Sequence, residues 1–319
     1  MNYIFILLIL FGVEILYFQL ADRFNIIDKP NERSSHSTVT LRGGGIIFYF
    51  AAMIYFIQYG FGYSWFFLGL SLMTIVSFLD DIYTLSNKVR LVIHFVSVIL
   101  MAYQLQVFEM PLYYLIITFI IVVGVINAYN FMDGINGITA CYSLAVGALL
   151  MLMNKKIHYI EQDLLAYSLL GVLVFAFFNF RTKAKCFAGD VGSVAIAYIL
   201  LFALGMLIIK TGNLIYILFL TVYGVDAVWT IIRRLIRKEN IFEAHRSHLY
   251  QFLGNEARLN KLLISFLYGL MQFIIGYLVI IVSDKSINEQ FAFSFILLIT
   301  LSILYLLFKS YIIKKYVKN

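Results

Sequence analysis

Amide and carboxylate side chains gather at residues 127–137, NAYNFMDGING, where a long apolar run ends. Asn127, Asn130 and Asp133 recur every three residues, so a continuing helix places them on one face. The glycines among and after them leave room for a ligand to approach the backbone. A helix cap is the alternative, but a cap needs only one such residue. The stretch therefore predicts the wall of a binding site for a polar phosphorylated ligand.

Three aspartates stand at the ends of other apolar runs. Asp80 and Asp81 close one run, at a helix C-terminus whose dipole disfavours negative charge. They could bind Mg²⁺, accept a proton from a reacting phosphate, or pair with Lys88 or Arg90. Asp190 opens a later run between two glycines, where it could cap the helix. Since Mg²⁺ favours one or two carboxylates plus substrate phosphates, we predict Asp190 as a metal ligand.

Two further polar stretches carry basic side chains. Residues 28–45 combine basic and hydroxyl groups with the glycines 43–45, and this combination favours a phosphate cradle. Residues 245–251, HRSHLYQ, follow a basic run, and they favour phosphate or sugar recognition over zinc because no cysteine or third histidine stands at ligand spacing. The predicted binding residues are Arg33, Ser34, His36, Lys88, His245, Arg246 and His248.

The elements that must position these residues cross a membrane. The chain is 62% hydrophobic and 13% charged, with a mean hydropathy of +0.91, which a soluble domain of 319 residues would not tolerate. We therefore expect a single all-α domain, a polytopic bundle embedded in the lipid bilayer. The apolar runs predict eleven transmembrane helices near 3–20, 45–60, 64–79, 91–108, 111–128, 135–153, 164–180, 191–209, 213–232, 262–282 and 291–312.

Basic residues set the expected orientation. With the N-terminus outside and the C-terminus in the cytoplasm, all but four of the 24 Lys and Arg residues lie inside. The inside connections then include 21–45, 80–90, 127–137, 180–193 and 233–261, so we predict one cytoplasmic active site built from them. Membrane topology also explains the net charge of +7, and a nucleic-acid partner is not expected. Cys141 and Cys186 show neither a disulfide framework nor metal-ligand spacing.

A few charged residues interrupt apolar runs. Glu14 and His94 are expected to face the bundle interior, with no role assigned. Asp226 lies seven residues before Arg233, on the same helical face, and is expected to steady that arginine or to face the site.

Taken together, these motifs resemble the polyprenyl-phosphate N-acetylhexosamine-1-phosphate transferases, the superfamily that includes phospho-N-acetylmuramoyl-pentapeptide transferase and the enzymes that initiate O-antigen synthesis. The resemblance runs from Asp28 to Gln251 and rests on Pro30-Asn31 with residues 33–36, Asp80-Asp81, residues 127–137, residues 189–193 and the histidine stretch.

The resemblance implies an enzyme of the bacterial inner membrane that transfers a sugar-1-phosphate from a UDP-N-acetyl sugar to undecaprenyl phosphate. It implies that Asp190 holds Mg²⁺, for which Mn²⁺ can substitute, that Asp80 and Asp81 serve the lipid phosphate, and that the Asn-rich motif binds the nucleotide. A homodimer is left open.

Two departures affect the substrate. Thr84 stands where the acidic motif of the family often has a third aspartate, and the histidine stretch resembles members that use 6-deoxy sugars such as FucNAc or QuiNAc rather than GlcNAc. The alternative function is a transporter or flippase of a phosphorylated lipid, which should show charged groups deep in several spans and polar loops on both faces. A CDP-alcohol phosphotransferase is disfavoured because its aspartate-rich signature is absent.

Overall fold

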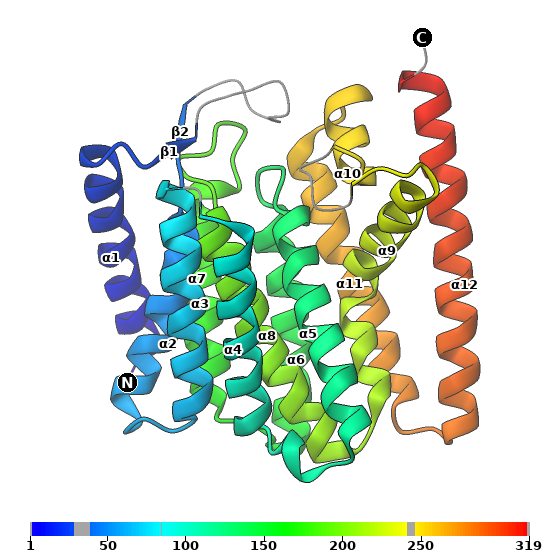
Figure 1. The fold of residues 1–319 in the computed structure, drawn as a ribbon, viewed down its shortest axis with the longest axis horizontal. Coiled ribbons are helices and arrows are strands. Elements are labelled where there is room, and N and C mark those ends of the chain that lie inside the picture. The colour runs from blue at the N-terminus through cyan, green and yellow to red at the C-terminus, as the bar shows by residue number, and fades with distance from the viewer. Residues whose placement is uncertain (1, 29–38, 84, 241–245, 318–319) are drawn as a thin grey trace.

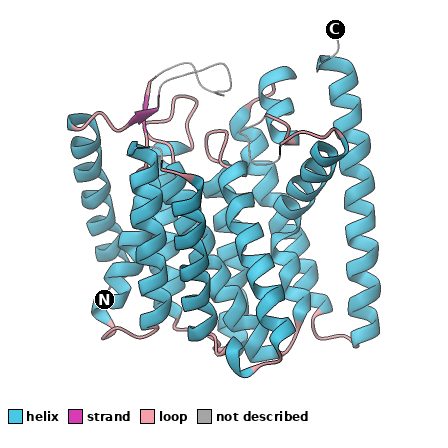
Figure 2. Ribbon diagram, in the orientation of Figure 1, coloured by secondary structure: helices cyan, strands magenta, loops and turns pink. Residues whose placement is uncertain are grey.

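The computed structural model is a bundle of helices (Figures 1 and 2), and it describes residues 2–28, 39–83, 85–240 and 246–317. Its elements are α1 (Tyr3–Arg23), β1 (Ile27–Asp28), β2 (Thr40–Leu41), α2 (Ile47–Gln58), α3 (Ser64–Tyr83), α4 (Asn87–Gln104), α5 (Leu112–Met132), α6 (Ile138–Ile157), α7 (Gln162–Asn179), α8 (Gly189–Thr211), α9 (Thr221–Ile236), α10 (Leu249–Gln251), α11 (Lys261–Val282) and α12 (Ile287–Ile312). The prediction of an all-α membrane bundle is confirmed.

Each predicted apolar run coincides with a helical segment, but not all are equally suited to a bilayer. Over the described ranges, nine segments are long and apolar enough to cross a membrane, and a tenth, residues 44–58, is shorter. The remaining run forms α4, whose first turns carry Lys88, Arg90 and His94 and are therefore less apolar. The structure thus supplies nine to ten candidate spans where the sequence predicted eleven.

Helix α8 lies at the centre of the bundle, in contact with α2, α3, α5 and α6. It is apolar on all sides and buries most of its length, as expected of a helix enclosed by others. Helix α12 is the opposite case, since it stands at the edge of the bundle (Figure 1) and buries only Gln290, Tyr305, Lys309 and Ile312. The core therefore surrounds α8, and its N-terminus is held by neighbours on several sides.

The polar connections gather at one end of the bundle (Figure 1). The β1–β2 pair, the α3–α4 and α5–α6 connections and the stretch before α8 all lie at the end where α12 terminates, whereas α1 begins at the opposite end. A parallel bridge from Leu41 to Cys186 joins β2 to the stretch before α8. The structure therefore brings together segments that lie more than 140 residues apart in the chain.

Candidate active site

Three carboxylates and two arginines meet at the polar end of the bundle. Arg42 places Nε 2.7 Å from Asp81 Oδ1 and a terminal nitrogen 3.7 Å from Asp190 Oδ1. Arg90 lies 2.7 Å from Asp80 Oδ2 and 3.1 Å from Asp190 Oδ2. Both arginines bridge Asp190 to one member of the acidic pair. We call Asp80, Asp81 and Asp190 the carboxylate cluster.

Asp81 holds the N-terminus of α8. Its two carboxylate oxygens accept hydrogen bonds from the backbone N–H groups of Asp190, at 3.1 Å, and Val191, at 3.0 Å. A negative charge at a helix N-terminus is favoured by the helix dipole. Asp190 itself does not cap the helix, because it lies inside the first turn and directs its side chain to the two arginines. The capping alternative for Asp190 is therefore wrong, and Asp81 supplies the cap.

The glycines near residue 44 bring two backbone segments together. Gly44 N–H donates to Phe187 O at 2.8 Å, and Gly45 N–H donates to Ala188 O at 3.1 Å. These two amides are occupied, so the predicted phosphate cradle is wrong for them. A Cβ on Gly192 would lie 2.5 Å from Gly45 Cα, and glycine is required here because the two backbone segments are in direct contact. The glycines thus position Asp190 beside Arg42.

The donor set around Asp190 fits a magnesium ion. Mg²⁺ takes one or two carboxylates and completes its octahedron with phosphate and water oxygens. The side chain of Asp190 is 17% exposed. The carboxylates of Asp80 and Asp81 form ion pairs with the same two arginines. Within the described ranges, however, no three His, Cys, Asp or Glu side chains form a complete metal-binding group. A metal would therefore depend on ligands from a substrate.

The predicted polar wall is formed by the end of α5. The helix continues through Asn127 and Asn130 as predicted, and Asp133 is its C-cap residue. Asn127 donates to the carbonyl of Val123 at 2.9 Å, which turns its amide back along its own helix. Asp133 accepts a hydrogen bond from Thr139 at 2.6 Å. Asn130 and Asp133 are therefore the members of the wall best placed for a ligand.

The wall lies within electrostatic reach of the carboxylate cluster. Burial raises the pKa of the Asp133 carboxyl to about 6, against the hydrogen bond from Thr139, which lowers it. The negative charge of Asp190 raises the same pKa further, and the positive charge of Arg42 lowers it. The two predicted halves of the site, the nucleotide wall and the acidic cluster, are thus electrostatically coupled.

Asn179, the last residue of α7, joins the α5–α6 connection to the stretch before α8. Its side-chain oxygen accepts from Gly137 N–H at 2.6 Å, and its amide donates to Cys186 O at 2.8 Å. Asn136 adds a hydrogen bond of 2.7 Å to Arg181 O. These bonds fix the α5–α6 connection against the stretch before α8, and they set the distance between the wall and Asp190.

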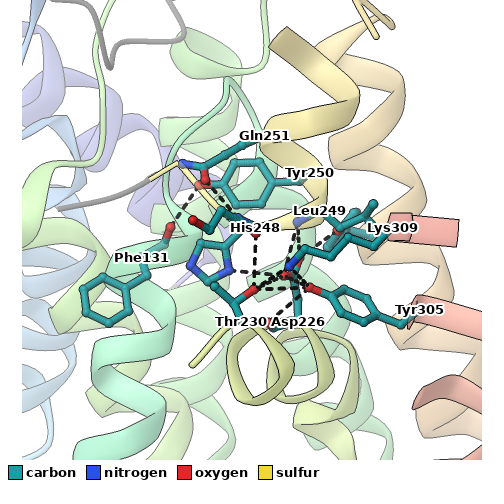
Figure 3. A network of polar contacts seen from close by, with 11 residues as sticks. Phe131, Asp226, Thr230, His248, Leu249, Tyr250, Gln251, Tyr305 and Lys309 are labelled. Carbon is teal, nitrogen blue, oxygen red and sulfur yellow. Dashed lines mark hydrogen bonds and ion pairs between the residues drawn. The ribbon is translucent and has the colours of Figure 1, made fainter. Parts of the chain in front are cut away.

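Asp226 organises the start of α10 in the histidine stretch (Figure 3). His248 is 2% exposed, and its Nδ1 lies 3.2 Å from Asp226 Oδ1. Leu249 N–H donates to the same carboxylate at 3.2 Å. Asp226 was expected to steady Arg233 or to face the site, and the first expectation is wrong because the carboxylate binds the start of α10. Arg246 pairs with Glu256 at 3.7 Å.

Several predicted residues remain outside this geometry. Lys88 is exposed in the first turn of α4, and Arg90 takes the pairing role with Asp80 that was left open between them. Glu14 and His94 are buried, as predicted. The predicted binding residues Arg33, Ser34, His36 and His245 lie outside the described residues.

Sequence reasoning missed four residues that build the site. Arg42 was placed only within the predicted phosphate cradle, and Arg90 was offered only as an alternative pairing partner of Asp80 and Asp81, so neither was named as a site residue. Asn179 and Tyr250 were not singled out. Asn179 ends an apolar run on the polar side, the same signal that marked Asn127, and could have been found. Tyr250, whose hydroxyl donates to Phe131 O at 2.9 Å, offered no comparable signal.

Comparison with known proteins places this chain among membrane transferases. Residues 63–211 match the sequence profile of Glycosyl transferase family 4. The chain is 26% identical to a Bacillus subtilis protein named probable undecaprenyl-phosphate N-acetylglucosaminyl 1-phosphate transferase, over 90% of this chain and 85% of that protein. Proteins named undecaprenyl-phosphate alpha-N-acetylglucosaminyl 1-phosphate transferase are 25% identical in Thermotoga maritima (80% of this chain, 82% of the relative) and 26% identical in Escherichia coli K12 (76% and 74%).

Proposed function

We propose that this chain, whose residues 63–211 match glycosyl transferase family 4, transfers an N-acetylhexosamine-1-phosphate from a UDP-sugar to undecaprenyl phosphate and releases UMP. The observation that carries the proposal is the carboxylate cluster bound by Arg42 and Arg90 beside a wall of amides. Carboxylates and arginines in one partly exposed place suit a reaction between phosphates. All three carboxylates and Arg90 lie inside the region that matches the family, and Arg42 lies before it.

The reaction is a phosphoryl transfer with a simple balance of bonds. An oxygen of the lipid phosphate attacks the β-phosphorus of the UDP-sugar, and a new phosphorus–oxygen bond forms. The bond from the β-phosphorus to the bridging oxygen breaks, and that oxygen leaves with its electron pair on UMP. The product is a lipid-linked pyrophosphoryl sugar. Such transfers depend on positioning and on neutralisation of charge rather than on covalent catalysis by the protein.

Each part of the site has a role in this scheme. Mg²⁺ held by Asp190, with Mn²⁺ as a substitute, would neutralise charge that develops on the pyrophosphate. Arg42 and Arg90 present guanidinium forks next to Asp190 and can contact phosphate oxygens. Asp80 has one oxygen on Arg90 and one on Leu85 N–H, at 2.6 Å, and we assign it to the lipid phosphate. Asp81 positions α8.

We assign the nucleotide sugar to the side of the wall and the histidine stretch. Asp133 lies within electrostatic reach of Asp190 and Arg42, and Asn130 lies three residues before it at the end of α5. The Tyr250–Phe131 hydrogen bond joins the histidine stretch, with Arg246 and His248, to the same end of α5. The three relatives described above are named as N-acetylglucosaminyl 1-phosphate transferases, one of them as probable, so we propose UDP-GlcNAc as the donor. UDP-FucNAc and UDP-QuiNAc are the donors to test against it, and the product would initiate O-antigen, capsule or another cell-envelope glycan.

We also propose that the polar end of the bundle faces the cytoplasm, with eleven spans and the N-terminus outside. The excess of basic residues on the polar connections supports this orientation. The relative from Escherichia coli K12, a bacterium with an inner membrane, supports a location of this chain in that membrane. UDP-sugars are made in the cytoplasm, and this orientation gives the site access to them.

Purified protein with undecaprenyl phosphate and a β-³²P-labelled UDP-sugar tests the reaction. We expect the label in the lipid fraction, UMP in the aqueous fraction, and no product in EDTA. Release of labelled UDP would indicate a glycosyl transferase that breaks the sugar–phosphate bond. A lipid fraction with no new species would contradict the proposed function and favour a transporter. Comparison of UDP-GlcNAc with UDP-FucNAc and UDP-QuiNAc then tests the sugar.

A further inference from the structure

Helix α12, at the edge of the bundle, buries a lysine and a tyrosine near its C-terminal end. Of the residues of α12, only Gln290, Tyr305, Lys309 and Ile312 are buried, and the last three share one face at spacings of four and three. Gln290 donates to Ser283 O and Lys285 O at 3.0 Å, and so holds the other end of the helix. The buried polar groups of α12 are therefore confined to its two points of attachment.

Lys309 is 4% exposed and is bound by two hydroxyl groups (Figure 3). Its ammonium donates to Tyr305 OH at 2.5 Å and to Thr230 Oγ1 at 2.8 Å. These hydroxyls donate in turn to Asp226 Oδ1, at 2.8 Å from Tyr305 and 3.3 Å from Thr230. Burying an ammonium group costs free energy unless the charge is paired. Here two hydroxyl groups link the ammonium of Lys309 to the buried carboxylate of Asp226 through hydrogen bonds.

A contribution to stability alone does not explain this buried network of charged and hydroxyl groups. Apolar residues of similar volume often stabilise a fold as well as a buried ion pair, because the charges must be removed from water. Leucine would be compatible with the positions of Tyr305 and Lys309, since most of α12 is apolar. The network is better explained by the geometry that it imposes on the groups around Asp226.

Asp226 transmits that geometry to the histidine stretch. Besides the hydrogen bonds from the Tyr305 and Thr230 hydroxyls, the Asp226 carboxylate accepts three more. They come from His248 Nδ1, from Leu249 N–H and from Tyr268 OH, the last at 3.0 Å. An ionised carboxylate only accepts, so Nδ1 must be the protonated nitrogen of His248, and Asp226 therefore fixes both the tautomer and the orientation of the ring. The next residue, Tyr250, reaches the end of α5.

We propose that Tyr305 and Lys309 are positioning residues for the nucleotide-sugar side of the site, acting through Asp226 on His248. The proposal rests on the proposed function, since it requires a UDP-sugar to bind between the histidine stretch and the end of α5. Neither residue touches a substrate. Their effect is to hold one ring orientation and one tautomer of His248 from the lipid-facing edge of the bundle.

The end of α12 and the helical turn that follows it offer a matched control. Tyr311 and Lys315 repeat the tyrosine–lysine pair at the same spacing, with Lys315 Nζ 3.1 Å from Tyr311 OH, but that pair is exposed. We would compare Tyr305→Phe and Lys309→Met with Tyr311→Phe and Lys315→Met. Phenylalanine retains the ring of Tyr305 and removes only the hydroxyl that Asp226 and Lys309 share.

Steady-state kinetics with both substrates tests the proposal. For Tyr305→Phe we expect the KM for the UDP-sugar to rise about tenfold, the loss typical of one hydrogen bond to a charged group. The KM for undecaprenyl phosphate should stay within about twofold of the wild-type value, and the control variants should change neither constant. In a His248→Ala background, Tyr305→Phe should add no further increase in KM, because the effect passes through that ring.

Four outcomes would contradict the inference. Equal changes in both KM values that follow a loss of thermal stability would make the network merely structural. Additive effects of Tyr305→Phe and His248→Ala would show that Tyr305 does not act through the histidine. If Tyr305→Phe matched Tyr311→Phe in an active enzyme, the inference alone would fail, whereas a wild-type protein that releases no UMP would overturn the proposed function and this inference with it.

Discussion

The carboxylates of the cluster differ in what surrounds them. Asp81 is fully buried, with both oxygens on backbone N–H groups of α8 and a guanidinium beside it. Asp80 keeps one oxygen on a backbone amide and the other on Arg90. Asp190 forms ion pairs with Arg42 and Arg90, and its side chain is the most exposed of the three. Only Asp190 therefore combines charge, access and freedom from a backbone role.

Asp190→Asn should nearly abolish turnover. The substitution retains the shape of the side chain and removes the charge that would hold Mg²⁺, so we expect kcat to fall by about 10²–10³-fold. Thermal unfolding in detergent should change little, because Asp81 and not Asp190 holds the start of α8. Asp163→Asn, at the opposite end of the bundle, is the control. Wild-type activity in Asp190→Asn, or in EDTA, would contradict the metal assignment.

The acidic pair should separate into a catalytic and a structural residue. In Asp81→Asn an amide –NH₂ must face a backbone N–H of α8, which leaves a buried donor unpaired and costs about 1–3 kcal/mol. Asp80→Asn can retain its acceptor for Leu85 N–H. We therefore expect both variants to lose activity, but only Asp81→Asn to unfold at a clearly lower temperature. Equal unfolding temperatures would refute this division.

What the sequence could predict at this scale was the type of residue, not its partner. Polar residues at the ends of apolar runs identified the three aspartates and the Asn-rich wall. Whether Asp81 binds a metal, a lysine or a helix N-terminus depends on which helix lies beside it, and spacing along the chain carries no such information. Asp226 illustrates the same limit, since its helical face pointed to Arg233 while its carboxylate binds the start of α10.

At the scale of elements, the site depends on the contact between residues 44–46 and the start of α8. Gly45 and Gly192 approach so closely that neither has room for a side chain, and two hydrogen bonds run alongside. This contact holds Arg42 next to both Asp81 and Asp190. The glycine-rich stretch was predicted as a phosphate cradle. Glycines in a sequence indicate that another group can approach the backbone closely, but they do not show whether that group is a phosphate or, as here, another segment of the chain.

Gly192→Ala should push these two segments apart. Its Cβ would meet Gly45 Cα and, at 3.0 Å, Ala188 Cβ, so we expect a loss of about 1–3 kcal/mol and a large fall in activity. Gly124→Ala in α5 is the matched control, because nothing lies within 4 Å of its added Cβ and alanine favours a helix. Comparable thermal unfolding of the two variants would show that the close contact is unimportant.

At the scale of the whole molecule, hydropathy predicted the helices well, and the ends of the helices less well. The run expected near 91–108 is α4, which begins at Asn87 because Ser86 caps it and Arg90 is drawn to the carboxylate cluster. Tertiary contacts thus extend a helix through residues that hydropathy assigns to a loop. The gathering of polar connections at one end was predictable, because alternate connections of a bundle share a face and the polar ones alternate.

The remaining question at this scale is which end faces the cytoplasm, and cysteine labelling in whole cells can answer it. We would replace Cys141 by alanine and Cys186 by serine, which retains a donor near Glu14. Single cysteines would then be placed at two exposed sites, Thr182 at the polar end and Lys285 before α12.

An impermeant thiol reagent should label Lys285→Cys in intact cells and Thr182→Cys only after permeabilisation, since the basic connections are expected inside. Equal labelling of both sites in permeabilised cells establishes that each is accessible. The reverse pattern would place the carboxylate cluster away from cytoplasmic UDP-sugars. Because the donor would then be out of reach, that result would count against the proposed reaction as well as against the orientation.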